Sequence, residues 1–135
     1  MTPARHRHQH GDRGTVSVMF AVLGIGLLMA TGLAVDGGRK LGALSEARDV
    51  ADNAARAGAQ ELDETQFRLT GQPILDPLAA EARALQYLAT VGHTGTVTVI
   101  DDTVTVSVTI DVDTTILPID LTASATESAT AVEGI

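Results

Sequence analysis

Residues 15–35 read TVSVMFAVLGIGLLMATGLAV and contain no charged side chain. An α-helix rises about 1.5 Å per residue, so a helix of this length spans about 30 Å, the thickness of the hydrocarbon core of a bilayer. A helix buried in a soluble domain of this size is seldom apolar on every side. The stretch therefore predicts a transmembrane helix.

The two flanks of this apolar stretch carry opposite charge. Residues 1–14, MTPARHRHQHGDRG, hold three arginines against one aspartate, whereas Asp36 directly follows the stretch. Cytoplasmic flanks of transmembrane helices are enriched in Arg and Lys. We therefore expect residues 1–14 to form a basic arm in the cytoplasm, and the C-terminus to lie outside the cell (inner or plasma) membrane, which the chain crosses once.

A cleaved secretory signal is the alternative interpretation of the same stretch. Ala30, Thr31 and Gly32 provide small residues of the kind found at signal cleavage sites. The apolar run is longer than most signal-peptide cores, which favours a helix that stays in the membrane. The alternative predicts a small secreted binding module.

Composition narrows the function classes further. The chain has 135 residues, enough for one modest domain, with no Cys, no Trp and a net charge of −8. The absence of Cys excludes disulfide scaffolds and thiol nucleophiles, and the acidic balance with few aromatic residues argues against a nucleic-acid partner. A single lysine, Lys40, against eight arginines is typical of a GC-rich bacterial genome.

Residues 36–62 carry a second helical pattern. Small and apolar side chains recur at intervals of three and four residues, which marks one helical stripe: Leu44, Ala47, Ala51, Ala54, Gly58 and Leu62. We expect one continuous helix from Thr15 to about Leu62, with a kink, if any, at Gly37-Gly38. Because small side chains permit close helix approach, residues 44, 47, 51, 54 and 58 are the candidate contact stripe for a partner protein.

A loop and a shorter helix are predicted next. Gly71 and Pro73 indicate a loop between Asp63 and Asp76. The helix expected at 77–91 has Asp76 as its N-cap, Pro77 at its first position and Gly92 as its stop. Its apolar face is marked at helical spacing by Leu78, Ala82, Leu85 and Ala89.

From residue 95 to 131 the pattern has period two, as in β-strands. Residues 96–112 read TVTVIDDTVTVSVTIDV, and a two-residue turn at Asp101-Asp102 places Val99 opposite Val104 and Thr98 opposite Thr105. A third strand is expected from Leu121 to about Ala131. The predicted fold class is α+β: a transmembrane helix that continues into an Ala-rich helix, a short helix, and a small antiparallel sheet.

The residues offer no convincing catalytic or metal site. His6, His8 and His10 alternate within the basic arm, and His93 stands alone in a Gly-rich turn where we expect it to be exposed. The aspartates near the strands lack the spacing of a calcium loop and are explained by turns and strand ends: Asp101, Asp102, Asp111, Asp113 and Asp120. No nucleophile–base pair stands out. We expect a non-catalytic protein without cofactor or metal.

The order of these parts resembles the TadE/TadG-like proteins of Flp (tight-adherence) pilus assembly. The residues that carry the resemblance are Asp12-Arg13-Gly14, the apolar span, Val35-Asp36-Gly37-Gly38-Arg39, and the Ala/Asp run at 47–59. The resemblance implies a membrane-anchored structural part of a type IV-like secretion and pilus machine. Its partners would be the membrane and other pilus-assembly proteins, met through helix–helix contacts.

Pseudopilin-type members of that family are cut by a prepilin peptidase after a glycine that precedes the apolar helix. The matching bond here is Gly14–Thr15. The pilin pattern then places a Glu at the fifth position after the cut, where this chain has Met19, followed by the matching aromatic Phe20. Without that Glu, the resemblance favours an uncleaved TadG-like anchor over a processed minor pseudopilin.

Overall fold

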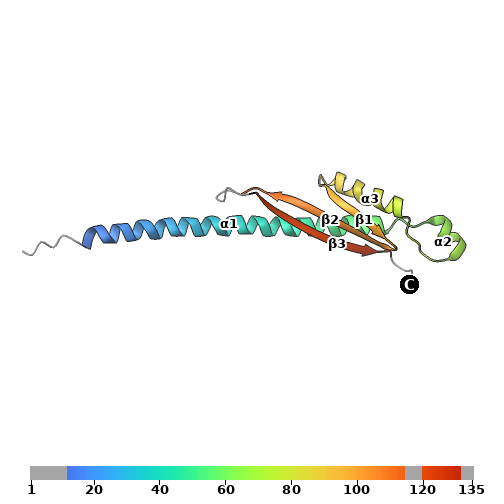
Figure 1. Cartoon of the computed structure of the whole chain (residues 1–135), viewed down its shortest axis with the longest axis horizontal. Helices are drawn as coiled ribbons and strands as arrows, with labels where there is room; N and C mark the ends of the chain where they lie inside the picture. The colour runs from blue at the N-terminus through green and yellow to red at the C-terminus, as the bar shows by residue number, and fades with distance from the viewer. Residues whose placement is uncertain (1–11, 115–119, 132–135) are drawn as a thin grey trace, which may run out of the picture.

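The computed structural model describes residues 12–114 and 120–131 of the chain. Its architecture is one long helix that carries a small α+β head on its C-terminal half (Figure 1). In chain order the elements are α1 (Asp12–Ala59), α2 (Glu64–Thr70), α3 (Pro77–Thr90), β1 (Gly95–Ile100), β2 (Thr103–Val112) and β3 (Leu121–Thr130). The predicted α+β class is confirmed.

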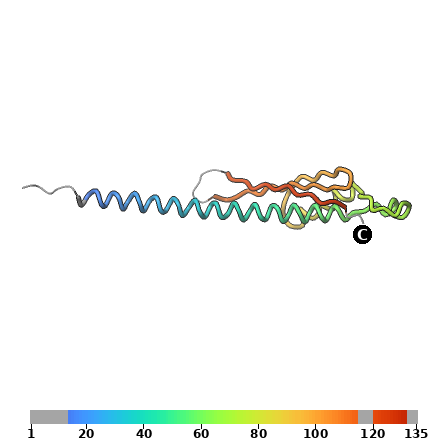
Figure 2. Tube along the Cα trace, turned by 90° about the horizontal axis from the view of Figure 1, so that it is seen from below, coloured from blue at the N-terminus to red at the C-terminus, as the bar shows by residue number. Residues whose placement is uncertain are grey.

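Helix α1 is a single 48-residue helix that passes through Gly37-Gly38 without interruption. Its N-terminal half extends alone beyond the head, and its C-terminal half lies along the sheet (Figure 2). The prediction of one long helix is confirmed, although it ends at Ala59 and not at Leu62. Leu62 instead forms an isolated β-bridge with Leu75.

The three strands form an antiparallel sheet in the order β1-β2-β3. Strand β1 pairs with β2 in the register expected from the sequence, with Val99 opposite Val104 and Thr98 opposite Thr105. In the turn between these strands, Asp101 has a φ of +54°, a left-handed conformation that Asp tolerates better than most residues do. The expected third strand is β3, and it pairs with β2 along its whole length.

One face of the sheet forms the core with α1 and α3. Val104, Val106 and Val108 of β2 are fully buried in the centre of this face. Helix α1 packs against β2 and β3, and α3 packs against β1 and α1. The alanines of α1 and β3 leave little space between these elements, so the helix lies close to the sheet.

The other face of the sheet carries hydroxyl side chains. Four cross-strand pairs between β2 and β3 have their oxygens 2.7–3.4 Å apart: Thr103–Thr130, Thr105–Ser128, Ser107–Thr126 and Thr109–Ser124. These pairs follow from the period-two pattern, because successive strand residues point to opposite faces.

The structure corrects the expectation of a loop between Asp63 and Asp76, since α2 lies within it. Asp63 caps this helix by accepting hydrogen bonds from the backbone N–H groups of Thr65 and Gln66. Gly71 ends it in a left-handed conformation, with a φ of +74°. Asp63 and Gly71 are residue types that cap helices, but Gly71 and Pro73 together are also loop signals.

The structure also corrects the buried face of α3. The predicted apolar side chains at positions 78, 82, 85 and 89 are exposed, and the helix buries Ala80, Ala84 and Leu88 instead. The physical reason is close packing against α1: a β-carbon on Gly58 would lie 2.8 Å from the backbone oxygen of Ala80 and 3.4 Å from Cβ of Ala84. Leucine at either position of α3 would not fit there. The predicted caps, Asp76 and Pro77, are as expected.

Candidate membrane anchor and contact sites

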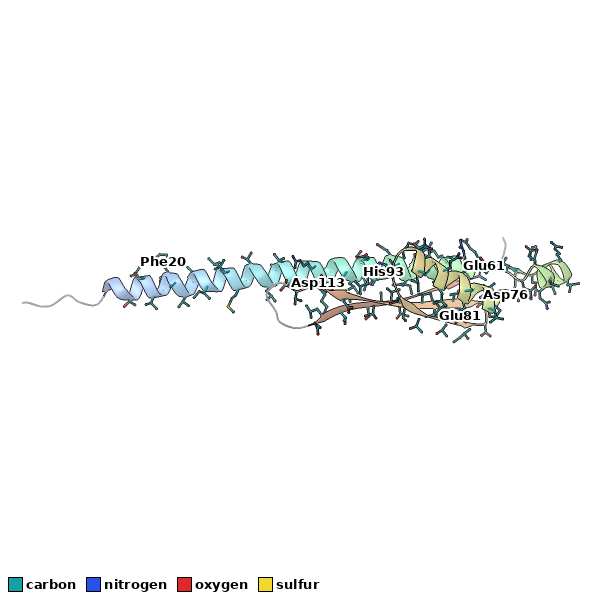
Figure 3. The ribbon with its side chains drawn as sticks, turned by 90° about the horizontal axis from the view of Figure 1, so that it is seen from above. Phe20, Glu61, Asp76, Glu81, His93 and Asp113 are labelled. Carbon is teal, nitrogen blue, oxygen red and sulfur yellow. The ribbon has the colours of Figure 1, made fainter. Side chains whose placement is uncertain are left out.

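The N-terminal half of α1 presents apolar side chains with no cover from the head. Among the described residues, α1 is the one helix long and apolar enough to cross a membrane. Phe20 projects from this half of the helix in Figure 3. Along its described residues, twelve large apolar side chains are exposed: Val16, Val18, Met19, Phe20, Val22, Leu23, Ile25, Leu27, Leu28, Met29, Leu33 and Val35. Burial of these side chains in lipid would remove this apolar surface from water.

The head begins where the apolar half of α1 ends. Asp36, the first charged residue after the apolar stretch, is 1% exposed. One turn further on, Nη1 of Arg39 donates to the backbone oxygen of Asp113, at the end of β2, over 3.5 Å. Figure 3 places Asp113 beside α1. This hydrogen bond joins the end of β2 to α1 at the border of the apolar segment.

The predicted processing site lies at the start of α1. Gly14 is in the first turn of the helix, with no atom within 4 Å of the position a β-carbon would take. Thr15 and Met19 are both exposed. A peptidase that acts on the Gly14–Thr15 bond would have to unwind one helical turn, the turn that has the fewest backbone hydrogen bonds to hold it.

The candidate contact stripe on α1 lies inside the head. Ala47, Ala51 and Ala54 are fully buried, Gly58 is buried against α3, and Leu44 is half-buried. The small side chains do permit close helix approach, as expected, but the elements that approach are the sheet and α3 of the same chain. The head of the same chain therefore covers most of the stripe.

His93, expected to be exposed, is instead held between α3 and α1. Its Nε2 lies 3.3 Å from a carboxylate oxygen of Glu46, and about a fifth of its side chain is exposed. Its backbone N–H donates to the oxygen of Leu88. His93 thus links the end of α3 to α1, as Figure 3 illustrates.

No three His, Asp or Glu side chains gather into a possible metal site within residues 12–114 and 120–131. Asp101 and Asp102 occupy the hairpin turn, while Asp111 and Asp113 lie at the far end of β2. His6, His8 and His10 lie outside the described residues. Within the described residues, the aspartates near the strands therefore lie at turns and strand ends.

Sequence reasoning missed an exposed apolar cluster at the end of the molecule farthest from the apolar half of α1 (Figure 1). The cluster comes from α2, its flanks and the first turn of α3: Leu62, Phe67, Leu69, Ile74 and Leu78. We call residues 61–78, which carry it, the distal tip. The signal in the sequence was the presence of large apolar residues, one of them an aromatic, within a segment read as a loop.

The fold is thus a long helix, apolar and exposed in its first half, that carries a small antiparallel sheet on its second half. Residues 14–61 match the model of a family described as putative Flp pilus-assembly TadE/G-like, so the resemblance predicted from the sequence is confirmed over this segment. The match covers nearly all of α1 and ends at the start of the distal tip. No curated protein and no solved structure matches the chain.

Proposed function

We propose that this protein is a single-pass, non-catalytic structural component of a Flp/Tad pilus-assembly apparatus. The observation that supports it best is the family match over residues 14–61, on a helix whose apolar side chains are exposed. In this proposal residues 1–14 lie in the cytoplasm, residues 15–35 cross the membrane, and residues 36–135 form an extracytoplasmic module. The module would contact other proteins of the apparatus.

The continuity of α1 supports retention of the apolar segment. The helix passes from the apolar half into the core of the head without a break, so the anchor and the head are one rigid element. Removal of a signal peptide near Gly32 would cut within this helix, four residues before the buried Asp36. The secreted alternative therefore requires cleavage of a bond inside regular helix.

A processed pseudopilin is the second candidate. The family match begins at Gly14, the residue after which a prepilin peptidase would cut. Met19 weighs against incorporation into a filament, because a carboxylate at that position is what would pair with a neighbouring subunit's new N-terminal amine. A prepilin peptidase would then be a partner of the chain.

The N-terminal residue of the protein recovered from its native host's membranes tests these candidates. We expect a start at Met1 or Thr2, which an uncleaved anchor requires. A start at Thr15 would support the processed pseudopilin and contradict the uncleaved anchor. Recovery of the protein from the medium with a start near Leu33 would support the secreted module.

A further inference from the structure

The distal tip is a preformed projection with almost no core of its own. None of the seven residues of α2 is buried. A helix of this length is marginal in water unless other contacts hold it. Here Asp63 caps its start, Gly71 ends it, and an ion pair of 3.3 Å joins Glu64 to Arg68 one turn apart.

The base of the projection is closed by backbone contacts. The N–H of Asp63 donates to the oxygen of Ile74 over 2.8 Å, and the N–H of Asp76 donates to the oxygen of Glu61 over 2.9 Å. Leu62 and Leu75 form a β-bridge between these two bonds. The tip is therefore fixed in shape while its apolar side chains stay in water, and a preformed surface loses less entropy on binding.

The exposed apolar surface of the tip is large for so small a segment. Leu69 is 77% exposed, Leu78 80% and Phe67 48%. In α3, the exposed Leu85 lies seven residues after Leu78 and therefore on the same face of the helix. Several large apolar side chains exposed on one small projection indicate a candidate interaction site.

The membrane that holds the anchor cannot cover this surface. Between Val35 and Ala59, α1 rises by about 36 Å, so the tip stands that far above the end of the apolar segment. The side chains around the tip also disfavour an anionic lipid surface, because four carboxylates (Glu61, Asp63, Glu64 and Asp76) outnumber two arginines: Arg68 of the tip, and Arg83, whose Nε lies 3.8 Å from Oε1 of Glu61. The occupant must be a protein.

The same charges disfavour a second copy of the chain. Copies anchored in one membrane would bring their acidic tips side by side at the same height, where like charges repel. Resting on the proposed extracytoplasmic placement, we infer that the distal tip docks a protein of different sequence. The partner would present an apolar pocket bordered by Lys and Arg side chains.

Thiol labelling of the full chain in its native membranes tests this inference, since the natural sequence has no Cys. The variant Leu69→Cys places a thiol on the tip, and Ile100→Cys places a matched thiol on the exposed hairpin end. A membrane-impermeant maleimide is applied to cells whose outer envelope is permeabilised, and to the purified chain. We expect the thiol at position 69 to react about tenfold more slowly in cells than after purification, as 90% occupancy requires. The thiol at position 100 should react equally in both.

Two charge variants of the Leu69→Cys chain test the chemistry of the partner. Glu64→Lys and Arg68→Glu each break the same ion pair, but they change the net charge of the tip in opposite directions. We expect Glu64→Lys to abolish the protection and Arg68→Glu to keep it. Equal loss in both variants would overturn the charge argument.

Other outcomes would overturn the inference itself. Full reactivity at position 69 in cells would show an uncovered tip. Protection in liposomes that contain this chain alone would identify lipid or a second copy as the occupant, and oxidative cross-linking between two thiols at position 69 would identify the copy. If the thiol at position 100 also fails to react in cells, the proposed extracytoplasmic placement of the head is wrong.

Discussion

Gly58 of α1 lies so close to Ala80 of α3 that a β-carbon on the glycine would be 2.8 Å from the alanine's backbone oxygen. Cγ1 of Val104 in β2 lies 3.1 Å from the same position, the one a β-carbon on Gly58 would take. All three layers of the head therefore meet at a residue without a side chain. This contact determines which face of α3 is buried.

Gly58→Ala should destabilise the head by about 1–2 kcal/mol, because the clash with backbone atoms outweighs the gain in helix propensity. The readout is urea unfolding of the purified chain followed by the fluorescence of its single tyrosine, Tyr87, which packs against the core. Gly42→Ala is the matched control, since its β-carbon meets open space and α1 should gain up to about 1 kcal/mol. Equal effects of the two substitutions would contradict the packing at Gly58.

Val106→Ala should lower the free energy of unfolding by about 2 kcal/mol, since it leaves a cavity in the centre of the buried sheet face. Thr98→Ala, on the exposed face of β1, is expected to change it by less than about 0.5 kcal/mol. Both are measured by the same unfolding experiment. If the threonine proves the more sensitive of the two, the hydroxyl face and not the valine face must be the one that packs.

Asp101→Gly should stabilise the hairpin by about 0.5 kcal/mol. Glycine adopts the left-handed φ of +54° without the steric cost that Asp carries there. This steric cost is larger than the extra backbone entropy that glycine loses on folding. Asp102→Gly should do the opposite, because that residue has no positive φ to relieve and its carboxylate lies 3.1 Å from the hydroxyl of Thr103. Thermal unfolding of the two variants, compared with the natural chain, gives the sign of each effect.

Ile25→Asp should reduce membrane integration, because a charge at the centre of the span costs about 2.5–3.5 kcal/mol on insertion scales. The measurement is the fraction of the chain that resists alkaline extraction from membranes. Ile25→Leu should leave that fraction unchanged. Undiminished integration of the aspartate variant would argue that residues 15–35 do not lie within lipid.

The register of the sheet was predictable from the sequence because it depends on local order. Val and Thr alternate with period two on both sides of Asp101-Asp102, and a slip by one residue would turn every valine to solvent. The paired Val99 and Val104 follow directly from that turn. The long apolar helix was predictable for a similar reason, since an uncharged run of this length matches the thickness of a bilayer by itself.

The faces of the helices were less predictable. Leucine spacing pointed to residues 78 and 85 as the inner side of α3, yet Ala80 and Ala84 are buried because their small side chains allow close approach to Gly58. Hydrophobicity ranks leucine above alanine, but contact between two helix backbones depends on size. That preference becomes visible only when the partner helix is in place.

The amino-acid sequence by itself therefore determined the apolar helix, its continuation, the strands and the pairing of the β1–β2 hairpin, because each depends on periodicity or length within one segment. Tertiary structure alone decided that the stripe from Ala47 to Gly58 is internal, and that α2 projects with Phe67 and Leu69 in water. Both facts depend on what lies across from a side chain in space, and no spacing along a single segment encodes that.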